Sequence, residues 1–525
     1  MTSSPVFLTM SDVGRREGEN VTLGATVRLP VEDGEYWWGG AAADGIEMPF
    51  TDGYRADLRD LGGNQGMPML LSSKGRYVWS DRPFAIEMSG GELLLRADVA
   101  AGIIVGGGHG DLPGVYRQLA EDRFPPDGRM PDPLLFTAPQ YNLWIETLFE
   151  PTQDNVLAYA QAVLDNGFPP GILMIDDRWH EEYGQWTFHS GRFPDPAAMV
   201  ARLHEMGFKV MLWLVPYVTP DSLVFRRLRE EGLLIRDRRG RPAIGEWWNG
   251  FGAALDLLKP EALRWLSGEL RRLRQDVGVD GFKFDGGEAA FYADLGCPDP
   301  QAYTIAWNRF GLPYPLNEFR DAWLAAGLPL AQRQRDKHHA WEGRDGLASL
   351  IPNALAQALT GHAYTCPDMI GGGEYQSFGS ADFDPELFVR YAQASALFPM
   401  MQFSAAPWRL LSAEHLEHCR SAASLHERFG PEILALAKDS SRTGDPIMRS
   451  LEFAFPGQGH ERVADQFMLG PDLLVAPVLV KGATSREVVL PPGDWQADDG
   501  TLLHGPDIVT VTAPLSRLPW FRRQG

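Results

Sequence analysis

Acidic side chains follow three short apolar segments that are predicted to be strands. Asp176 and Asp177 follow the first segment, Asp285 follows the second, and Asp368 follows the third. Carboxyl groups gathered in one place can act as nucleophile, general acid or ligand of sugar hydroxyl groups. A single aspartate after a strand is more often a helix cap or a turn residue, so the repetition is what favours a site. Taken alone, this pattern leaves a structural role and a catalytic role about equally open.

Cleavage of a glycosidic bond needs two carboxyl groups in different states, one protonated and one ionised. In the retaining mechanism the two lie about 5–5.5 Å apart, and the ionised one attacks the anomeric carbon. Asp285 suits the ionised role because Lys283 lies two residues earlier on the same strand face. Gly286 and Gly287 are expected to leave room for a sugar ring. The 16 tryptophans hint at ring stacking on sugars, although most are expected in the core.

The elements that must bring these residues together alternate between strand and helix from about residue 141 onward. Short apolar runs at 142–145, 172–175, 210–215 and 281–284 are expected to be strands, separated by segments of helical periodicity. Repeated strand–helix units form a parallel sheet covered by helices. We therefore predict an α/β fold, a (β/α)8 TIM barrel, whose strands all end at one mouth.

Two β-rich regions flank the predicted barrel. A hairpin is expected around 84–96, with a strand at 21–29 before it, and a Pro-rich stretch from 124 to 139 follows. Near the other end, 472–480 and 486–490 have strand character. We predict an N-terminal β-sandwich at 1–125, a catalytic barrel at 126–435 and a C-terminal β-sandwich at 436–525.

The composition excludes several classes of function. A net charge of −21 argues against nucleic-acid binding, and no apolar run is long enough to cross a membrane. We expect no secretory signal in the first 20 residues. Only three cysteines are present, which argues against a disulfide framework and a zinc site and favours a cytoplasmic location. We predict no cofactor and no metal, and the oligomeric state stays open, a homo-oligomer included.

Residues 282–288, FKFDGGE, resemble the nucleophile motif of glycoside hydrolase family 31. The likeness is greatest to the branch that contains myogenesis-regulating glycosidase and bacterial α-galactosidases. It extends over about 130–490 and includes further matching segments in the same order. These are 175–179, 192–195, 247–250, 349–352, 367–372, 401–404 and 407–409.

The resemblance implies a retaining α-glycosidase in which Asp285 is the nucleophile. It also implies that Asp336, five residues before Trp341, is the acid/base, with Asp345 as the local competitor. Arg320 and Arg333 match arginines near the nucleophile of this family. His338 and His339 could tune Asp336, but we favour their interpretation as surface histidines of a loop.

The resemblance also implies which residues bind the substrate. Asp176 and Asp177 match positions that bind hydroxyl groups of the terminal sugar, and we predict that Lys283 binds the substrate beside them. Asp368 matches an acidic residue at the base of the site. Three tryptophans match aromatic walls of the family's pocket: Trp144, Trp213 and Trp248. For Trp213 and Trp248, packing in the barrel is an equally open alternative.

The expected substrate is a small oligosaccharide or another α-glycoside. Residues 401–404, MQFS, and the motif at 175–179 differ from those of the family's α-glucosidases and favour an exo-acting α-galactosidase. An α-glucosidase, an α-xylosidase, a sulfosugar-specific α-glycosidase and a transglycosylase remain alternatives. A non-catalytic carbohydrate-binding protein is the alternative from another class.

Overall fold

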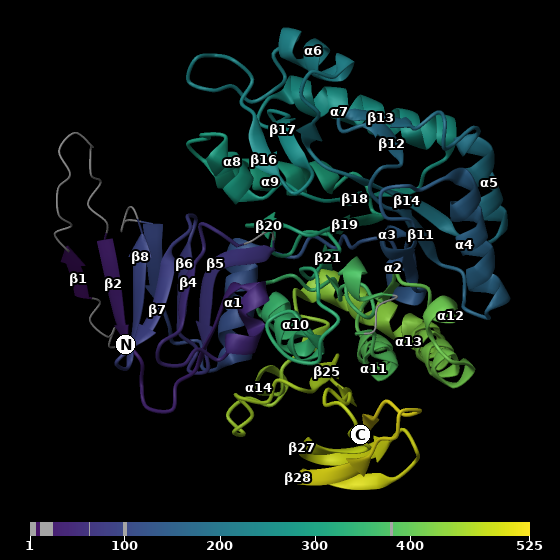
Figure 1. The fold of residues 1–525 in the computed structure, drawn as a ribbon. Coiled ribbons are helices and arrows are strands. Elements are labelled where there is room, and N and C mark those ends of the chain that lie inside the picture. Colours follow the sequence, from purple (N-terminus) through teal and green to yellow (C-terminus); the bar gives the residue numbers. More distant parts are fainter. Residues whose placement is uncertain (1–6, 11–24, 62–63, 98–101, 379–381, 525) are drawn as a thin grey trace.

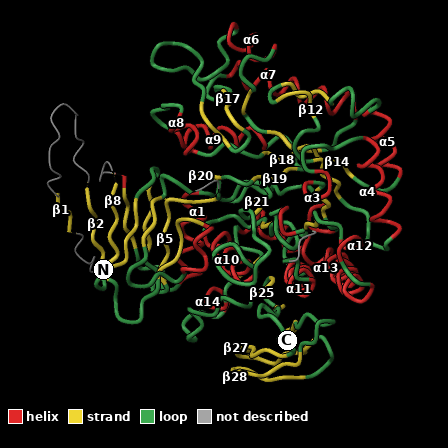
Figure 2. Tube along the Cα trace, in the orientation of Figure 1, coloured by secondary structure: helices red, strands yellow, loops and turns green. Residues whose placement is uncertain are grey.

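The computed structural model describes residues 7–10, 25–61, 64–97, 102–378 and 382–524. Figure 1 shows N-terminal sheets on the left, a barrel with its helices on the upper right, and a C-terminal sheet below. Strands gather in the same three places in Figure 2. Among the described helices, none is long and apolar enough to span a membrane.

Eight parallel strands form the central barrel, in the spatial order β22-β21-β19-β18-β14-β11-β10-β23. The main-chain N–H of Ile370, just after β22, donates to the carbonyl of Gln402 in β23 at 2.9 Å, which nearly closes the ring. The ladder pairing follows sequence order from β10 to β22, as expected for repeated βα units, and the last strand, β23, pairs with the first, β10. The strands are β10 (Gln140–Asn142), β11 (Ile172–Ile175), β14 (Lys209–Leu214), β18 (Gly281–Phe284), β19 (Asn317–Phe319), β21 (Gln332–Arg333), β22 (Thr365–Cys366) and β23 (Gln402–Phe403).

Helices cover the outside of the barrel, and their ends follow local chemistry. The hydroxyl of Thr152 and the side chain of Asn155 form a capping box at the start of α4. Asp195 caps α5, whose first residue is Pro196. The long helices are α4 (Gln153–Asp165), α5 (Pro196–Glu205), α7 (Pro260–Arg272), α9 (Pro300–Gly311), α10 (Leu350–Leu359) and α11 (Pro385–Ser395), and shorter ones are α2 (Leu134–Thr137), α3 (Trp144–Thr147), α6 (Leu223–Glu230), α8 (Ala289–Asp294) and α12 (Pro407–Leu410).

The N-terminal region forms two sheets. One has the order β1-β2-β8-β7-β4, and the other has β20-β5-β6-β9 with β3 paired to β5. Strand β20 comes from the barrel part of the chain and pairs in parallel with β5, which ties the two regions together. These elements are β1 (Phe7–Met10), β2 (Ala25–Pro30), β3 (Trp37–Ala41), β4 (Arg55–Asp57), β5 (Gln65–Ser72), β6 (Tyr77–Ser80), β7 (Ala85–Ser89), β8 (Glu92–Ala97), β9 (Ile103–Gly106), α1 (Leu112–Arg123) and β20 (Ala322–Trp323).

The C-terminal region is a six-stranded antiparallel sheet. It follows α13 (Ala413–Thr443), a long helix with Pro431 inside it. A register shift between Leu490 and Gly493 interrupts β27, so its two halves pair differently. The strands are β24 (Met448–Arg449), β25 (Phe467–Leu469), β26 (Leu473–Val475), β27 (Ser485–Ala497), β28 (Leu502–Thr512) and β29 (Trp520–Gln524).

The predicted fold class is confirmed: sheet regions precede and follow the barrel along the chain. The hairpin at 84–96 and the strands at 172–175 and 281–284 form as expected. The expected strand at 142–145 is wrong, because β10 ends at Asn142 and α3 begins at Trp144. Residues 21–24 of the first expected strand lie outside the described part of the chain. The domain limits stay predictions; the limit at 435/436 falls inside α13.

Candidate active site

A pocket of about 430 Å3 opens at the ends of the barrel strands. Almost all predicted site residues line it, although they come from segments almost 200 residues apart in sequence. Asp368 is the exception, since it is fully buried and does not line the pocket. The lining residues are Trp144, Phe149, Asp176, Asp177, Trp213, Trp248, Asn249, Lys283, Asp285, Arg320, Arg333, Asp336, Lys337, His338, Met369 and the segment 373–376.

Asp285 stands at the carboxyl end of β18 and is held from several directions. Its main-chain N–H donates to the carbonyl of Leu214, which continues the barrel pairing. The indole N–H of Trp213 donates to Oδ2 at 2.8 Å, and the N–H of Gly286 donates to Oδ1 at 2.9 Å. Burial would raise the pKa of Asp285, but the charges of Arg320, Lys283 and Arg333 outweigh it and lower that pKa. Asp285 is therefore a fixed, ionised carboxylate.

Arg320 lies between the two carboxylates that were predicted to be catalytic. Its Nε is 3.2 Å from Oδ1 of Asp285, and one terminal nitrogen is 3.7 Å from Oδ2 of Asp336. The other terminal nitrogen donates to Glu288. The guanidinium also lies over the ring of Trp248, 4.6 Å from its centroid. One head group therefore connects both predicted catalytic residues, which face the same pocket.

Asp336 lies on a loop after β21, and its side chain is 56% exposed. Arg333 donates to its Oδ1 at 2.9 Å. Desolvation in the pocket would raise the pKa of Asp336, but Arg333 and Arg320 hold it well below its usual value. The competitor Asp345 pairs with Arg335 at 3.1 Å and does not line the pocket. The geometry therefore favours Asp336 over Asp345.

The inner end of the pocket carries two further carboxylates. Lys283 donates from Nζ to Asp176 at 2.8 Å, and both side chains are almost fully buried. Asp177 accepts hydrogen bonds from the hydroxyl of Tyr183 at 3.0 Å and from the amide of Asn249 at 2.8 Å. Carboxylates held in this way keep free lone pairs toward the cavity, which suits the binding of neutral hydroxyl groups.

Asp368 acts beneath the pocket rather than in it. Its Oδ1 accepts from Arg333, and its Oδ2 accepts from the main-chain N–H of Lys337 at 2.6 Å. Burial raises the pKa of this carboxyl against the charge of Arg333. Asp368 therefore fixes Arg333 and the start of the Asp336 loop, and the predicted direct contact of Asp368 with substrate has no support in this geometry.

The three predicted aromatic residues occupy different places. Trp144 lines the pocket and donates its indole N–H to the carbonyl of Gly373 at 3.1 Å. Trp248 is 48% exposed at the turn between β16 (Gly245–Trp247) and β17 (Gly250–Ala254), so barrel packing does not explain it. Trp213 is only 2% exposed, and its polar contact is with Asp285.

The comparisons with known proteins agree with this architecture. The chain matches the glycosyl hydrolases family 31 TIM-barrel domain over residues 133–324 and the family 31 C-terminal domain over residues 444–525. The chain belongs to glycoside hydrolase family 31. The matched segments contain Asp285 and Arg320, whereas Asp336 lies between them.

Several curated proteins of this family are similar to the chain. Myogenesis-regulating glycosidase of Mus musculus is 34% identical over 77% of this chain and 58% of that protein. Alpha-xylosidase of Emericella nidulans is 28% identical over 66% and 46%, and sulfoquinovosidase of Escherichia coli is 26% identical over 64% and 53%. The chain thus spans about half the length of these relatives.

Solved structures of family 31 share the fold at low sequence identity. A dextranase of Flavobacterium johnsoniae complexed with glucose is 20% identical with a TM-score of 0.82, covering 99% of this chain and 68% of that one. An alpha-xylosidase from a soil metagenome complexed with xylose is 22% identical with a TM-score of 0.82, covering 98% and 81%.

Several site residues of this family 31 chain were missed by the sequence analysis. Glu288 pairs with Arg320 and accepts from the hydroxyl of Tyr217 at 2.7 Å. Glu288 stands three residues after Asp285, so its place in the motif was a usable signal. Tyr183 and Asn249, which hold Asp177, come from excursions outside the barrel strands, and no periodicity marks them.

Two interpretations from the sequence are wrong. Gly286 and Gly287 have positive φ, and a Cβ atom on Gly287 would lie 2.5 Å from the ring of Trp307. Neighbouring aromatic rings therefore explain these glycines better than room for a sugar. His339 is not a surface histidine, because its ring bridges the carbonyl of Gly371 and the N–H of Asp384 at 2.8 Å each.

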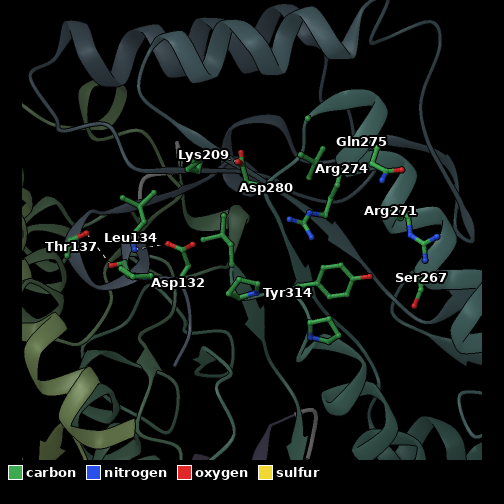
Figure 3. Close-up of a pocket in the computed structure, with 16 residues that line it drawn as sticks. Asp132, Leu134, Thr137, Lys209, Ser267, Arg271, Arg274, Gln275, Asp280 and Tyr314 are labelled. Carbon is green, nitrogen blue, oxygen red and sulfur yellow. Dashed lines mark hydrogen bonds and ion pairs between the residues drawn. The ribbon is translucent and has the colours of Figure 1, made fainter. Parts of the chain in front are cut away.

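A larger hollow, about 1160 Å3, lies at the opposite end of the barrel. Figure 3 shows Lys209 and Asp280 close together in it, with Arg274 and Tyr314 nearby. Each of these residues stands at the start of a strand or in the segment that leads into one. Because chemistry in this fold occurs at the carboxyl ends of the strands, the smaller pocket is the candidate active site.

Proposed function

We propose that this chain is an exo-acting, retaining α-glycosidase that uses Asp285 as nucleophile and Asp336 as acid/base. The observation that carries this proposal is the shared guanidinium of Arg320, which contacts both carboxylates in one pocket. A small cavity with carboxylates at its inner end fits one terminal sugar better than the middle of a long chain.

The proposed reaction is a double displacement. A carboxylate oxygen of Asp285 attacks the anomeric carbon while the bond to the leaving oxygen breaks, and Asp336 gives that oxygen its proton. Water then loses a proton to Asp336 and attacks the same carbon, which releases Asp285 and a sugar of unchanged anomeric configuration. An alcohol in place of water would give transglycosylation.

The two carboxylates fit these roles to different degrees. Asp285 is already ionised, as a nucleophile must be. Asp336 is also held in the ionised form by Arg333 and Arg320, which suits its second role as base. A neutral sugar seated between Asp336 and these arginines would weaken their attraction and raise the pKa of Asp336, so that it can bring a proton.

For the sugar itself we propose galactose as the first candidate. The argument is the divergence of residues 401–404 and 175–179 from α-glucosidase sequences. Met401, Gln402 and Ser404 do not line the pocket, so any effect of this segment on the sugar is indirect. Gln402 instead donates to the buried Glu318 at 2.6 Å, below the site. The named relatives favour xylose and sulfoquinovose as the next candidates.

The test is a panel of aryl α-glycosides with galactose, glucose, xylose and sulfoquinovose as the sugar. We expect release of the aryl group from the galactoside, with the α-anomer seen first by proton NMR. The β-anomer as the first product would overturn the retaining mechanism. Faster cleavage of another sugar would change the substrate and leave the chemistry intact.

A non-catalytic carbohydrate-binding protein is the alternative from another class. Calorimetry with galactose against the wild type and Asp285→Asn separates the two: binding without turnover of any glycoside in the panel would favour that alternative. We also propose a cytoplasmic location, on the grounds of the three widely separated cysteines.

A further inference from the structure

Gln65 of the N-terminal sheet reaches the main chain of both active-site arginines. It is the first residue of β5, and it is 1% exposed. Its amide nitrogen donates to the carbonyl of Arg320 and, at 2.6 Å, to the carbonyl of Arg333. Its amide oxygen accepts from Gln357 of α10 at 2.9 Å. A single side chain of one domain therefore connects two segments of another.

The orientation of this amide follows from its partners. Carbonyl oxygens only accept, so the NH2 group has to face Arg320 and Arg333. Both of its N–H bonds are used, and so is the oxygen. The amide nitrogen of Gln357, which donates to Gln65, also donates to the carbonyl of Gln332 at 3.3 Å. Both donors and the acceptor oxygen of Gln65 are therefore engaged, which makes this contact sensitive to replacement of Gln65. Within the described residues, the buried amide oxygen of Gln357 has no hydrogen-bond partner.

The two segments that Gln65 joins are short and carry the charges of the site. Arg320 directly follows β19, and Arg333 ends the two-residue strand β21. Few ladder hydrogen bonds fix a strand of this length. Arg320 contacts both Asp285 and Asp336, and Arg333 contacts Asp336. A shift of either main chain would move a guanidinium away from a carboxylate.

A second contact fixes the same place from the N-terminal side. Strand β5 pairs in parallel with β20, so that Ala322 lies opposite Gln65. The N–H of Ala322 also donates to the carbonyl of Asn64 at 3.4 Å. The segment after Arg320 is thus built into the N-terminal sheet, two residues beyond the arginine.

We propose that Gln65 is a positioning residue of the active site, which sets the spacing of Arg320 and Arg333 around the two carboxylates. The N-terminal sheet is then part of the catalytic apparatus and not only a support for the barrel. This inference rests on the proposed function of Asp285 and Asp336. The competing explanation is that the amide only satisfies two buried carbonyl groups.

Gln65→Met tests the proposal, because it keeps the side-chain volume and removes both donors. We expect kcat on the best aryl α-glycoside to fall by about 10- to 100-fold, with a much smaller change in KM. The acidic limb of the pH profile of kcat/KM moves to higher pH, since Arg320 no longer holds Asp285 ionised. Lys283 still faces Asp285, so the shift is partial.

Leu70→Ala is the matched control, since Leu70 is fully buried on the same strand β5. It is expected to lower the melting temperature without moving the pH profile. A Gln65→Met variant that loses stability like this control but keeps kcat and the pH profile would overturn the proposal. Should Gln65→Met not fold, Gln65→Asn keeps the amide on a shorter side chain and is measured in the same way.

A crystal structure of Gln65→Met beside that of the wild type gives a readout without turnover. We expect the guanidinium of Arg320 to leave Asp285 or Asp336. Both arginines in their original places would refute the positioning role, whatever the activity. A wild type that cleaves no glycoside would instead refute the proposed function, and the crystal structures would still decide on Gln65.

Discussion

The nucleophile side and the acid/base side of the pocket are built in opposite ways. Asp285 is buried at the end of a strand and is held by an indole, a main-chain N–H and a guanidinium. Asp336 is 56% exposed on a loop, and its ion-pair partners among the described residues are Arg320 and Arg333. The difference matches what each role demands. A nucleophile needs one fixed position and charge, whereas an acid/base must gain and lose a proton near water.

The largest effect is expected from Asp285→Asn, which tests the nucleophile side. We expect kcat to fall by more than about 10^4-fold, because the amide cannot form the glycosyl ester. Steady-state turnover of an aryl α-galactoside measures this loss. Asp280→Asn is the matched control, since Asp280 precedes the other end of β18. Similar losses in both variants would mean a structural effect.

Asp336→Ala tests the opposite side. Loss of a general acid/base lowers rates by about 10^2- to 10^4-fold, and the loss is greater for poor leaving groups than for activated ones. A comparison of dinitrophenyl and phenyl α-glycosides measures it. Asp345→Asn, a change in the same loop but away from the pocket, is expected to keep near-normal rates. The reverse result would make Asp345 the acid/base.

Trp213→Phe sharpens the description of the nucleophile side. It removes the hydrogen bond to Oδ2 of Asp285 but keeps a ring in place. Since that bond stabilises the ionised form, its loss raises the pKa of Asp285. The acidic limb of kcat/KM should move to higher pH, and kcat should fall by about tenfold. An unchanged limb would show that the charges of Arg320, Lys283 and Arg333 set this pKa without the indole.

The smallest effect is expected from Asp44→Asn, a change outside the barrel. Asp44 accepts from Arg344 in the Asp336 loop and from the hydroxyl of Tyr54 at 3.0 Å. Loss of the ion pair should loosen that loop and lower kcat by only about threefold, because Arg344 is more than half exposed. The measurement compares kcat on the dinitrophenyl and phenyl α-glycosides. Asp52→Asn, on an exposed turn of the same region, is the control.

The acidic strand ends could be predicted from the sequence because each is a local pattern. Apolar runs at 172–175 and 281–284 became strands with those bounds. The residues just after them then had to meet, since parallel strands of a barrel end at one mouth. Asp336 had no such signal and came only from family resemblance. Its loop has no periodicity, so its place depends on partners far away in sequence.

The sequence by itself determined the family, the barrel and most of the charged residues at its mouth, because short-range periodicity and the motifs of the family record these. The tertiary structure alone decided which charges pair. It put Arg320 between two carboxylates, buried Asp368 under Arg333 and brought Gln65 to both arginines from more than 250 residues away. Pairing of this kind depends on how separate domains pack together, and no local pattern in the chain records that.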